Sequence, residues 1–387
     1  MSGQPDKTVG VGMVGYAFMG RAHSLAWHAV TRAFDVPARP RLAAICGRDK
    51  AATERAAGQL GWASAETDWR ALIERDDVDL VDIAAPGDLH APIAIAALRA
   101  GKHVLCEKPL ANTLAEAQAM KEAADAAYPG GARAMVGFNY RRVPALALAR
   151  KVVEQGRIGT LRHVRAVYLQ DWLADPKAPM TWRMQAERAG SGALGDLGAH
   201  LVDLVRYLTG DEITGVSALA STFVGERPYA DGSGTGTVTV DDAVVFTARL
   251  ASGALASFEA TRYAAGHKNG LRIELNGSAG SLAFDLERLN ELEFLDGLLD
   301  NADQAGLSGF RRVLVTEPDH PYLTAWWPPG HTLGWEHSFT HQAADLLTAI
   351  AEGGQPRPSF ADGMAVQRVL DAVARSAATG QWAATGQ

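Results

Sequence analysis

The chain has 387 residues, a length that predicts two or three domains at roughly 100 to 200 residues each. Hydrophobic residues make up 47% and charged residues 21%, a balance that allows large buried cores and excludes an intrinsically disordered chain. The formal charge of −7, with no long run of one sign, argues against binding nucleic acid through a basic face. No apolar run approaches the roughly 18 residues of a membrane span, and the opening residues contain no apolar signal core, so we expect a cytoplasmic protein without a membrane partner.

Short β-rich runs alternate with helical stretches from Thr8 to Phe138, a pattern typical of a parallel sheet covered by helices on both faces. The predicted strands are 8–14, 41–46, 78–84, 103–106 and 133–138, and the predicted helices lie near 21–33, 50–60, 90–100 and 114–127. We therefore expect an α/β fold with a doubly wound parallel sheet in residues 1–141.

The pattern changes after Arg141, where alternation of period two indicates half-buried strands. The sequence predicts a helix at 144–154, strands at 162–172, 237–250, 253–262, 271–275 and 281–286, a loop at 324–331, and helices near 336–351 and 362–377. Because short turns join the paired runs, the sheet of this half is predicted to be largely antiparallel. We assign residues 142–387 to a second domain.

The first predicted strand runs into Gly15-Tyr-Ala-Phe-Met-Gly20 and then a helix, which is the context of a dinucleotide-binding turn. The first glycine permits the tight turn, and the last one lets the helix pack on the sheet with its N-terminus toward the phosphates. Position 17 is Ala, a departure from the strict pattern. The candidate cofactor contacts in this turn are Gly15, Ala17, Phe18 and Met19.

The second predicted strand ends at Gly47 and Arg48, where an NAD enzyme commonly carries an acidic residue for the ribose hydroxyls. Without that acid nothing repels a 2′-phosphate, and Arg48 can hold one or stack on adenine. These two candidate cofactor contacts favour NADP slightly and leave NAD open.

Ligands of doubly wound sheets bind at the carboxyl ends of the strands, where the chain has Pro86-Gly-Asp-Leu-His90 and Glu107-Lys-Pro109. A lysine at position 108 beside a nicotinamide can hydrogen-bond a substrate hydroxyl and favour its deprotonation. The alternative is a solvated surface lysine.

Asp196, His200 and Asp203 fall at i, i+4 and i+7, on one face of a predicted helix. A solvated polar stripe and a metal site are alternatives, although no recognised ligand spacing accompanies the residues and we predict no metal. A histidine oriented by a carboxylate one turn away fits a general base for an alcohol, which is the interpretation we favour.

With these motifs in hand, the chain resembles the glucose–fructose oxidoreductase/inositol dehydrogenase/rhizopine catabolism family, written Gfo/Idh/MocA, over essentially its whole length. The resemblance rests on the turn at 15–20, on Val81-Asp-Ile-Ala-Ala-Pro86 followed by a histidine, on Gly101-Lys-His-Val-Leu-Cys-Glu-Lys-Pro109 and on Gly195-Asp-Leu-Gly-Ala-His200. It implies a Rossmann domain followed by an α/β domain with an open, mainly antiparallel sheet, whose exposed face commonly builds dimers or tetramers.

Carried over by residue, the resemblance makes Lys108, Asp196 and His200 the catalytic trio. It makes Glu107 and the 86–90 loop, with Pro86, Asp88 and His90, contacts to the nicotinamide half of the cofactor. His200 would take the hydroxyl proton, Lys108 would stabilise the developing alkoxide, and Asp196 would orient the sugar and the histidine.

The stretches 168–172 and 181–185 look closest to the levoglucosan dehydrogenase branch of the family, whose members oxidise a pyranose-ring hydroxyl at C3. Aromatic faces stack on the apolar faces of sugar rings, and structural packing is the alternative use of the same side chains. The candidate substrate contacts are Tyr140, Trp172, Trp182, Arg183 and His337.

We therefore expect an NAD(P)-dependent dehydrogenase that removes a hydride from a ring hydroxyl, at C3, of a sugar, anhydrosugar or inositol, and that works as a homodimer or homotetramer. One alternative is a glycosidase that oxidises C3 transiently and returns the hydride. Another is a non-catalytic regulator that senses nucleotide or sugar, against which the intact trio argues.

Overall fold

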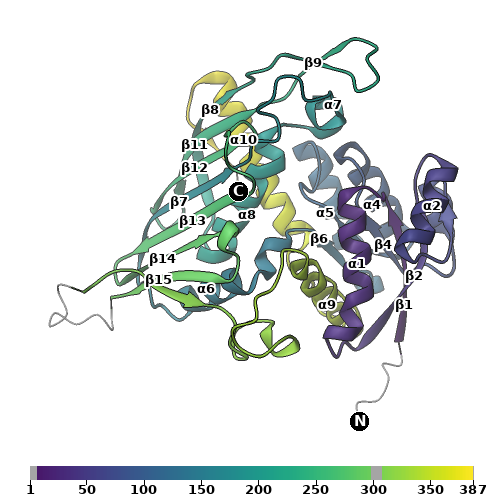
Figure 1. Ribbon diagram of the computed structural model, residues 1–387, viewed down its shortest axis with the longest axis horizontal. Coiled ribbons are helices and arrows are strands. Elements are labelled where there is room, and N and C mark those ends of the chain that lie inside the picture. The colour runs from purple at the N-terminus through teal and green to yellow at the C-terminus, as the bar shows by residue number, and fades with distance from the viewer. Residues whose placement is uncertain (1–6, 298–306, 387) are drawn as a thin grey trace. The chain divides into compact units, whose positions relative to one another are not determined.

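The computed structural model describes residues 7–297 and 307–386 (Figure 1). The opening residues, on which part of the expected cytoplasmic location rests, lie outside the described residues. The chain divides into two compact units, one of Met1–Asn139 with Glu336–Ala365 and the other of Tyr140–Trp335 with Val366–Gln387. A single boundary at residue 141 thus differs from the observed division, because a late segment returns to the first unit.

The first unit is the expected doubly wound domain. Its elements are β1 (Lys7–Val14), α1 (Phe18–Ala33), β2 (Ala38–Cys46), α2 (Lys50–Leu60), β3 (Ala65–Glu66), α3 (Trp69–Glu74), β4 (Leu80–Ile83), α4 (His90–Arg99), β5 (His103–Cys106), α5 (Leu114–Ala127), β6 (Ala134–Val136) and α9 (His337–Glu352). The strands are all parallel in the order β3-β2-β1-β4-β5-β6. This is the strand order of a dinucleotide-binding sheet, so the predicted fold class is confirmed.

The core of this unit explains why the late segment belongs to it. Apolar side chains of α9, among them Ala343, Leu346 and Ile350, pack in one buried cluster with Trp27 and Val30 of α1. Because α9 is amphipathic, it must cover its apolar face, and the α1 side of the parallel sheet receives it.

Helix starts in this unit follow local capping chemistry. The Asp49 side chain accepts the backbone N–H of Ala52 at the start of α2, and Thr113 forms a reciprocal capping box with Glu116 at the start of α5. These contacts satisfy N–H groups that a helix leaves unpaired at its first turn.

The second unit is built on a mixed sheet. Its elements are α6 (Pro144–Glu154), β7 (Leu161–Leu169), α7 (Ala186–Ala189), α8 (Ala199–Thr209), β8 (Ile213–Ser221), β9 (Glu226–Pro228), β10 (Thr235–Thr237), β11 (Ala243–Leu250), β12 (Leu255–Thr261), β13 (Gly270–Gly277), β14 (Gly280–Asp285), β15 (Glu291–Asp296), β16 (Arg311–Leu314) and β17 (Ala383–Ala384). The strand order is β16-β15-β14-β13-β7-β12-β11-β8-β17, and only β7 and β12 pair in parallel among the described residues. Helix α10 (Phe360–Thr379) begins in the first unit and ends in the second.

Alternation along the strands gives this sheet one buried and one exposed face. On β11 and β12 the inward Phe246 and Phe258 rings stack with centroids 4.4 Å apart. On the other face Leu219, Val245 and Leu255 are exposed, by 74%, 53% and 51%, and Val245 lies directly opposite Leu219 in the ladder. The sheet therefore has an open outer face that carries apolar side chains.

In the described part of the chain, no helix combines the length and the apolarity that a membrane span requires.

Candidate active site

The turn between β1 and α1 has the geometry of a dinucleotide-binding turn. Gly15 has φ of 105°, and a Cβ at Gly20 would come within 2.2 Å of the Gly15 carbonyl oxygen, so both positions require glycine. Ala17 and Phe18 are exposed, which explains how an alanine replaces the middle glycine without a clash. Helix α1 has no side-chain cap and no acidic residue in its first turn, so its free N–H groups suit a pyrophosphate.

The end of β2 is shaped by an aromatic ring. A Cβ at Gly47 would lie 2.1 Å from Cε1 of Tyr16, so no acidic side chain fits there while that ring keeps its place. Arg48 is exposed and has no hydrogen-bond or ion-pair partner among the described residues, whereas the Asp49 carboxylate caps α2. The position thus lacks a ribose-binding acid and offers a free guanidinium.

The loop after β4 is fixed by a buried histidine. The Nδ1 atom of His90 lies 2.9 Å from the Pro109 carbonyl oxygen, and Nε2 lies 3.0 Å from that of Ala85. Burial lowers the pKa of His90, while the hydrogen bonds to these backbone oxygens act in the opposite direction. Pro86 and Asp88 lie half-buried in the same loop.

Glu107 and Lys108 follow β5 directly. Glu107 is 4% exposed, and its carboxylate faces His23 of α1 at 3.0 Å and the backbone N–H of Lys108 at 3.3 Å. Lys108 itself is half-buried. Because parallel strands present their carboxyl ends at one sheet edge, this segment shares that edge with the Gly15 turn and the 86–90 loop.

In the second unit a π-helical turn, Leu194–Gly198, precedes α8 and carries Asp196. His200 follows in α8 and is 6% exposed, while Asp203 is 1% exposed and forms a buried ion pair with Arg141 at 2.6 Å. The three residues therefore do not lie on one continuous α-helix as predicted, since Asp196 belongs to the π turn, and Asp203 has an ion-pair partner in Arg141. A solvated stripe is excluded by the burial of His200.

A cap holds the start of this helix. The Asp241 carboxylate accepts the backbone N–H groups of Gly192 and Leu194 at 2.7 and 2.8 Å, and the Asp241 carbonyl accepts that of Ala193 at 3.0 Å. A Cβ at Gly192 would lie 1.7 Å from the Asp241 carbonyl oxygen, so glycine is required there. Sequence reasoning missed Asp241, because it lies 49 residues away from its partner.

Neutral polar groups line the His200 ring. The Tyr140 ring lies 4.6 Å from it and the Tyr168 ring 6.0 Å, centroid to centroid. The Tyr168 hydroxyl donates to Asn269 Oδ1 at 2.7 Å, so the Tyr140 hydroxyl, 2.9 Å away, donates to Tyr168 and accepts from the Trp335 indole. Burial raises the pKa of Tyr168, with the Tyr140 and Asp196 charges adding, so this phenol stays protonated.

The two predicted sugar-stacking residues have arginine partners. Trp172 is 40% exposed and lies 5.5 Å from the buried Arg262 guanidinium, and Trp182 lies 4.5 Å from that of Arg183. Arg262 also donates to the Arg183 carbonyl oxygen at 3.2 Å. It therefore joins these two segments of the second unit.

The remaining candidates belong to the first unit. His337 begins α9 and pairs with Glu336 at 3.5 Å. Lys108 and His337 thus lie in one unit, while Tyr140, Asp196 and His200 lie in the other.

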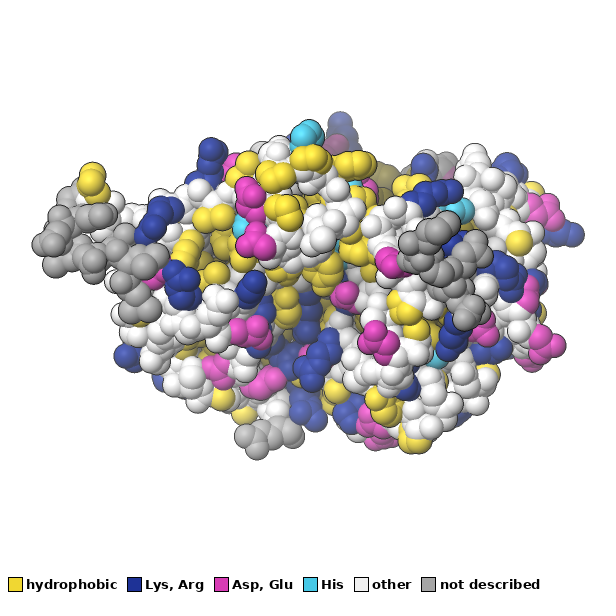
Figure 2. All heavy atoms as spheres, turned by 90° about the horizontal axis from the view of Figure 1, so that it is seen from below, with side chains coloured by type: hydrophobic (Ala, Val, Ile, Leu, Met, Phe, Trp, Pro, Cys, Tyr) yellow, Lys and Arg dark blue, Asp and Glu magenta, His cyan; other side chains and the backbone are white. Residues whose placement is uncertain are grey.

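No cluster of three metal-ligating side chains occurs within the described ranges. On the face seen in Figure 2, acidic side chains are scattered, and several basic side chains lie together near its lower middle.

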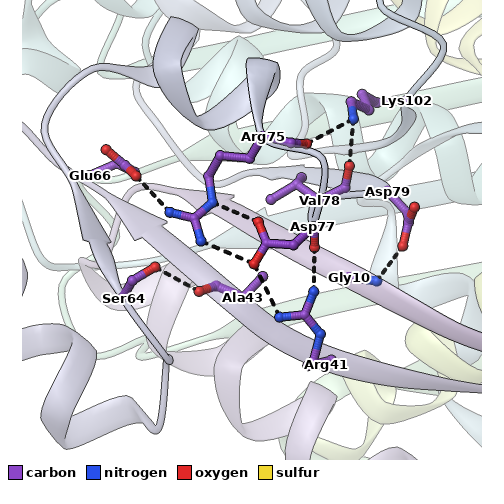
Figure 3. A network of polar contacts seen from close by, with 10 residues as sticks. All are labelled: Gly10, Arg41, Ala43, Ser64, Glu66, Arg75, Asp77, Val78, Asp79 and Lys102. Carbon is purple, nitrogen blue, oxygen red and sulfur yellow. Dashed lines mark hydrogen bonds and ion pairs between the residues drawn. The ribbon is translucent and has the colours of Figure 1, made fainter.

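A second polar network in the first unit lies away from these loops (Figure 3). Arg75 binds Asp77 and Glu66, Asp79 accepts the Gly10 N–H, and Lys102 donates to backbone oxygens before β4. Its members lie within β1, β2 and β3 and in the segments before β4 and β5, so the network ties these strands together.

Comparisons with known proteins agree with this geometry. Residues 9–138 match the model described as an oxidoreductase family with an NAD-binding Rossmann fold, and residues 146–283 match the GFO/IDH/MocA C-terminal domain. The chain belongs to the Gfo/Idh/MocA family of oxidoreductases.

Individual relatives are similar over nearly their full lengths. Levoglucosan dehydrogenase of Pseudarthrobacter phenanthrenivorans is 45% identical over 97% of this chain and 98% of its own. An oxidoreductase domain protein from Kribbella flavida superposes with a TM-score of 0.95 at 61% identity, covering 98% of this chain and 100% of that one. A levoglucosan dehydrogenase solved with NADH and levoglucosan gives a TM-score of 0.93 at 44% identity, with the same coverage.

Proposed function

We propose that this protein oxidises a ring hydroxyl, at C3, of levoglucosan or a closely related pyranose, with a nicotinamide cofactor as hydride acceptor. The observation that carries the proposal is the buried His200, with Asp196 four residues earlier, beside the rings of Tyr140 and Tyr168. A wall of neutral donors and acceptors suits a polyol, since each sugar hydroxyl needs partners when it leaves water. The named relative acts on such a sugar.

The bound nicotinamide would accept the hydride from the carbon that carries the hydroxyl. His200 takes the hydroxyl proton, because a neutral imidazole is a suitable base near neutral pH. Asp196 orients the histidine and a sugar hydroxyl, and the Lys108 ammonium stabilises negative charge on the reacting oxygen. The Trp172 and Trp182 rings offer faces for the apolar side of the sugar, while Arg183, Tyr140 and His337 bind its oxygens.

For the cofactor we propose that both NAD and NADP bind, with a lean to NADP. Gly47 leaves no acid to repel a 2′-phosphate, and Arg48 has no other partner in the described part of the chain. The Rossmann match and the relative solved with NADH account for NAD.

The test is the absorbance of reduced nicotinamide when purified protein meets NAD or NADP and a panel of levoglucosan, glucose, glycosides and inositols. Net reduction with a pyranose supports the proposal. Release of sugar from glycosides without net reduction favours a hydride-recycling glycosidase instead, and cofactor binding without either reaction favours a sensor.

Two further properties remain proposals. The exposed apolar face of the second sheet suits self-association into a homodimer or homotetramer. A cytoplasmic location would give the enzyme its nicotinamide pool, and cell fractionation tests it.

A further inference from the structure

A buried cluster of charges lies behind the Glu107–Lys108 segment of the first unit. His23 of α1 is 2% exposed, Asp82 of β4 is fully buried, and Glu107 is 4% exposed. The His23 Nδ1 atom lies 2.9 and 3.1 Å from the two Asp82 oxygens, and Nε2 lies 3.0 Å from Glu107 Oε1. No motif in the sequence assigns a role to this histidine.

The contacts fix the charge of the ring. Both ring nitrogens face carboxylates, which only accept hydrogen bonds, so both nitrogens carry protons. Burial by itself lowers the pKa of His23, but the charges and hydrogen bonds of Asp82 and Glu107 outweigh it and raise the pKa to about 10. The Phe339 ring of α9, 5.3 Å from the imidazole, adds no charge. The cluster thus holds an imidazolium between two carboxylates.

This cluster is connected to Lys108 through one side chain. While Oε1 of Glu107 faces His23, Oε2 accepts the Lys108 backbone N–H at 3.3 Å. Gly137 lies close to the oxygen that faces His23, since a Cβ at this position would come within 2.6 Å of Oε1. The orientation of the Glu107 side chain is therefore linked to the backbone position of Lys108, the next residue.

Stability alone does not account for such a group. Buried ion clusters often stabilise a fold no better than apolar side chains of the same size, because removing charges from water costs free energy. What they add is a defined geometry, as both hydrogen bonds to the imidazolium are directional.

We propose that His23 is a positioning residue, which holds the Glu107 carboxylate and thereby places Lys108 for its work on the substrate hydroxyl. The inference rests on the role given to Lys108 in the proposed function. Misplacement by about 1 Å is enough to slow a reaction about a hundredfold, so a residue that touches neither substrate nor cofactor can affect turnover strongly.

The test compares His23→Gln with Trp27→Phe. Trp27 lies one turn later on α1, is equally buried, and donates its indole N–H to Asp82 at 2.8 Å, whereas the hydrogen bonds of the Glu107 carboxylate go to His23 and Lys108. Both variants remove a hydrogen bond to Asp82, but only His23→Gln also removes the imidazolium that binds the Glu107 carboxylate. Glu107→Gln is a second variant that serves if His23→Gln does not fold. It keeps His23 and removes the negative charge of Glu107.

Two quantities are measured: kcat and KM for levoglucosan, and the NMR signal of Lys108 after reductive methylation with ¹³C-formaldehyde, which keeps the lysine charge. The Lys108 signal is assigned by its loss in Lys108→Arg. We expect His23→Gln and Glu107→Gln to lower kcat about tenfold or more with little change in KM and to move the Lys108 signal. Trp27→Phe should leave both within about twofold of the unmodified protein.

The inference would be overturned if His23→Gln kept the wild-type kcat and an unmoved Lys108 signal, or if Trp27→Phe lost as much activity as His23→Gln. In either case, sugar oxidation by the unmodified protein would leave the proposed function standing. If the unmodified protein oxidises no sugar, the proposed function fails. The Lys108 signal in the variants then decides the positioning role by itself.

Discussion

In the proposed function His200 accepts the proton of a sugar hydroxyl, and it is buried beside the rings of Tyr140 and Tyr168. We predict that His200→Ala lowers kcat for levoglucosan by about 10²- to 10⁴-fold, the usual contribution of a general base. NADH affinity, followed by the change in nicotinamide fluorescence, should stay the same, because the cofactor turn lies in the other unit. Retained turnover would remove His200 from the mechanism.

In the proposed function, the choice between NAD and NADP depends on Arg48. Arg48→Ala should raise KM for NADP about tenfold or more and change KM for NAD far less, since a charge-assisted hydrogen bond to the 2′-phosphate would be lost only with NADP. Initial rates at saturating levoglucosan measure both values. Equal changes for the two cofactors would show that Arg48 contacts adenine alone or remains in solvent.

Some residues of the candidate site can be predicted from the sequence, and others cannot. Lys108, Asp196 and His200 lie in short motifs whose spacing is local, so they can be proposed from the chain alone. The partners of His23 lie 59 and 84 residues away from it, and no periodicity marks such a pair. Ala17 could be judged tolerable only after the structure showed it exposed.

Among the elements, the start of the helix that carries Asp196 and His200 depends on a distant cap. Asp241→Ala removes two hydrogen bonds to backbone N–H groups and should cost about 1–2 kcal/mol of unfolding free energy. Because the cap positions the π turn, kcat should also fall about tenfold or more.

Thr113→Ala is the matched control. It removes the cap of α5, which carries none of the proposed site residues, and should cost about 1 kcal/mol without changing kcat. Thermal unfolding and initial rates are measured for both variants. Equal kcat in the two variants would show that the Asp241 cap serves stability only.

Element boundaries were predicted best where local chemistry sets them. The helix at 114–127 agrees with α5, which begins at a capping box, and the helix at 144–154 agrees with α6, which has proline in its first turn. Strands β3, β8, β9, β15, β16 and β17 were not predicted, and the predicted strand 237–250 includes only the last residue of β10. Their residues alternate too weakly, or over too short a run, to distinguish an edge or half-exposed strand from a loop.

For the molecule as a whole, His103 is one residue that makes the free energy of unfolding fall at acid pH. Burial lowers the pKa of His103 to about 4, with the Lys7 and Arg133 charges adding to the effect, and its Nδ1 accepts the Arg133 backbone N–H at 3.0 Å. In the unfolded chain His103 binds a proton near pH 6.5, whereas in the folded chain it does so only near pH 4. The stability that depends on a neutral His103 is therefore fully present above pH 6.5 and is lost as the pH falls toward 4. Its size is about 1–3 kcal/mol after allowing for partial exposure.

We predict that His103→Gln flattens the fall in unfolding free energy between pH 6.5 and 4. Denaturant titrations at several pH values measure the slope for both proteins. An unchanged slope would assign the acid sensitivity to other groups.

Self-association of the chain through the exposed apolar face of the second sheet can also be tested. Val245→Asp places a charge at the centre of the exposed apolar face, opposite Leu219. If that face joins copies of the chain, the variant should have a lower mass by light scattering at equal concentration. Ser217→Asp, on the same face of β8, is a weaker perturbation because it removes no apolar group. An unchanged mass in the Val245 variant would move the interface elsewhere.

The most direct measurement of the proposed activity is the formation of reduced nicotinamide from levoglucosan and NAD or NADP by the unmodified protein and by His200→Ala. We predict steady net reduction by the unmodified protein and a loss of about 10²-fold or more in the variant, with the cofactor still bound. No net reduction by the unmodified protein with either cofactor bound, or equal rates for the two proteins, would contradict this prediction.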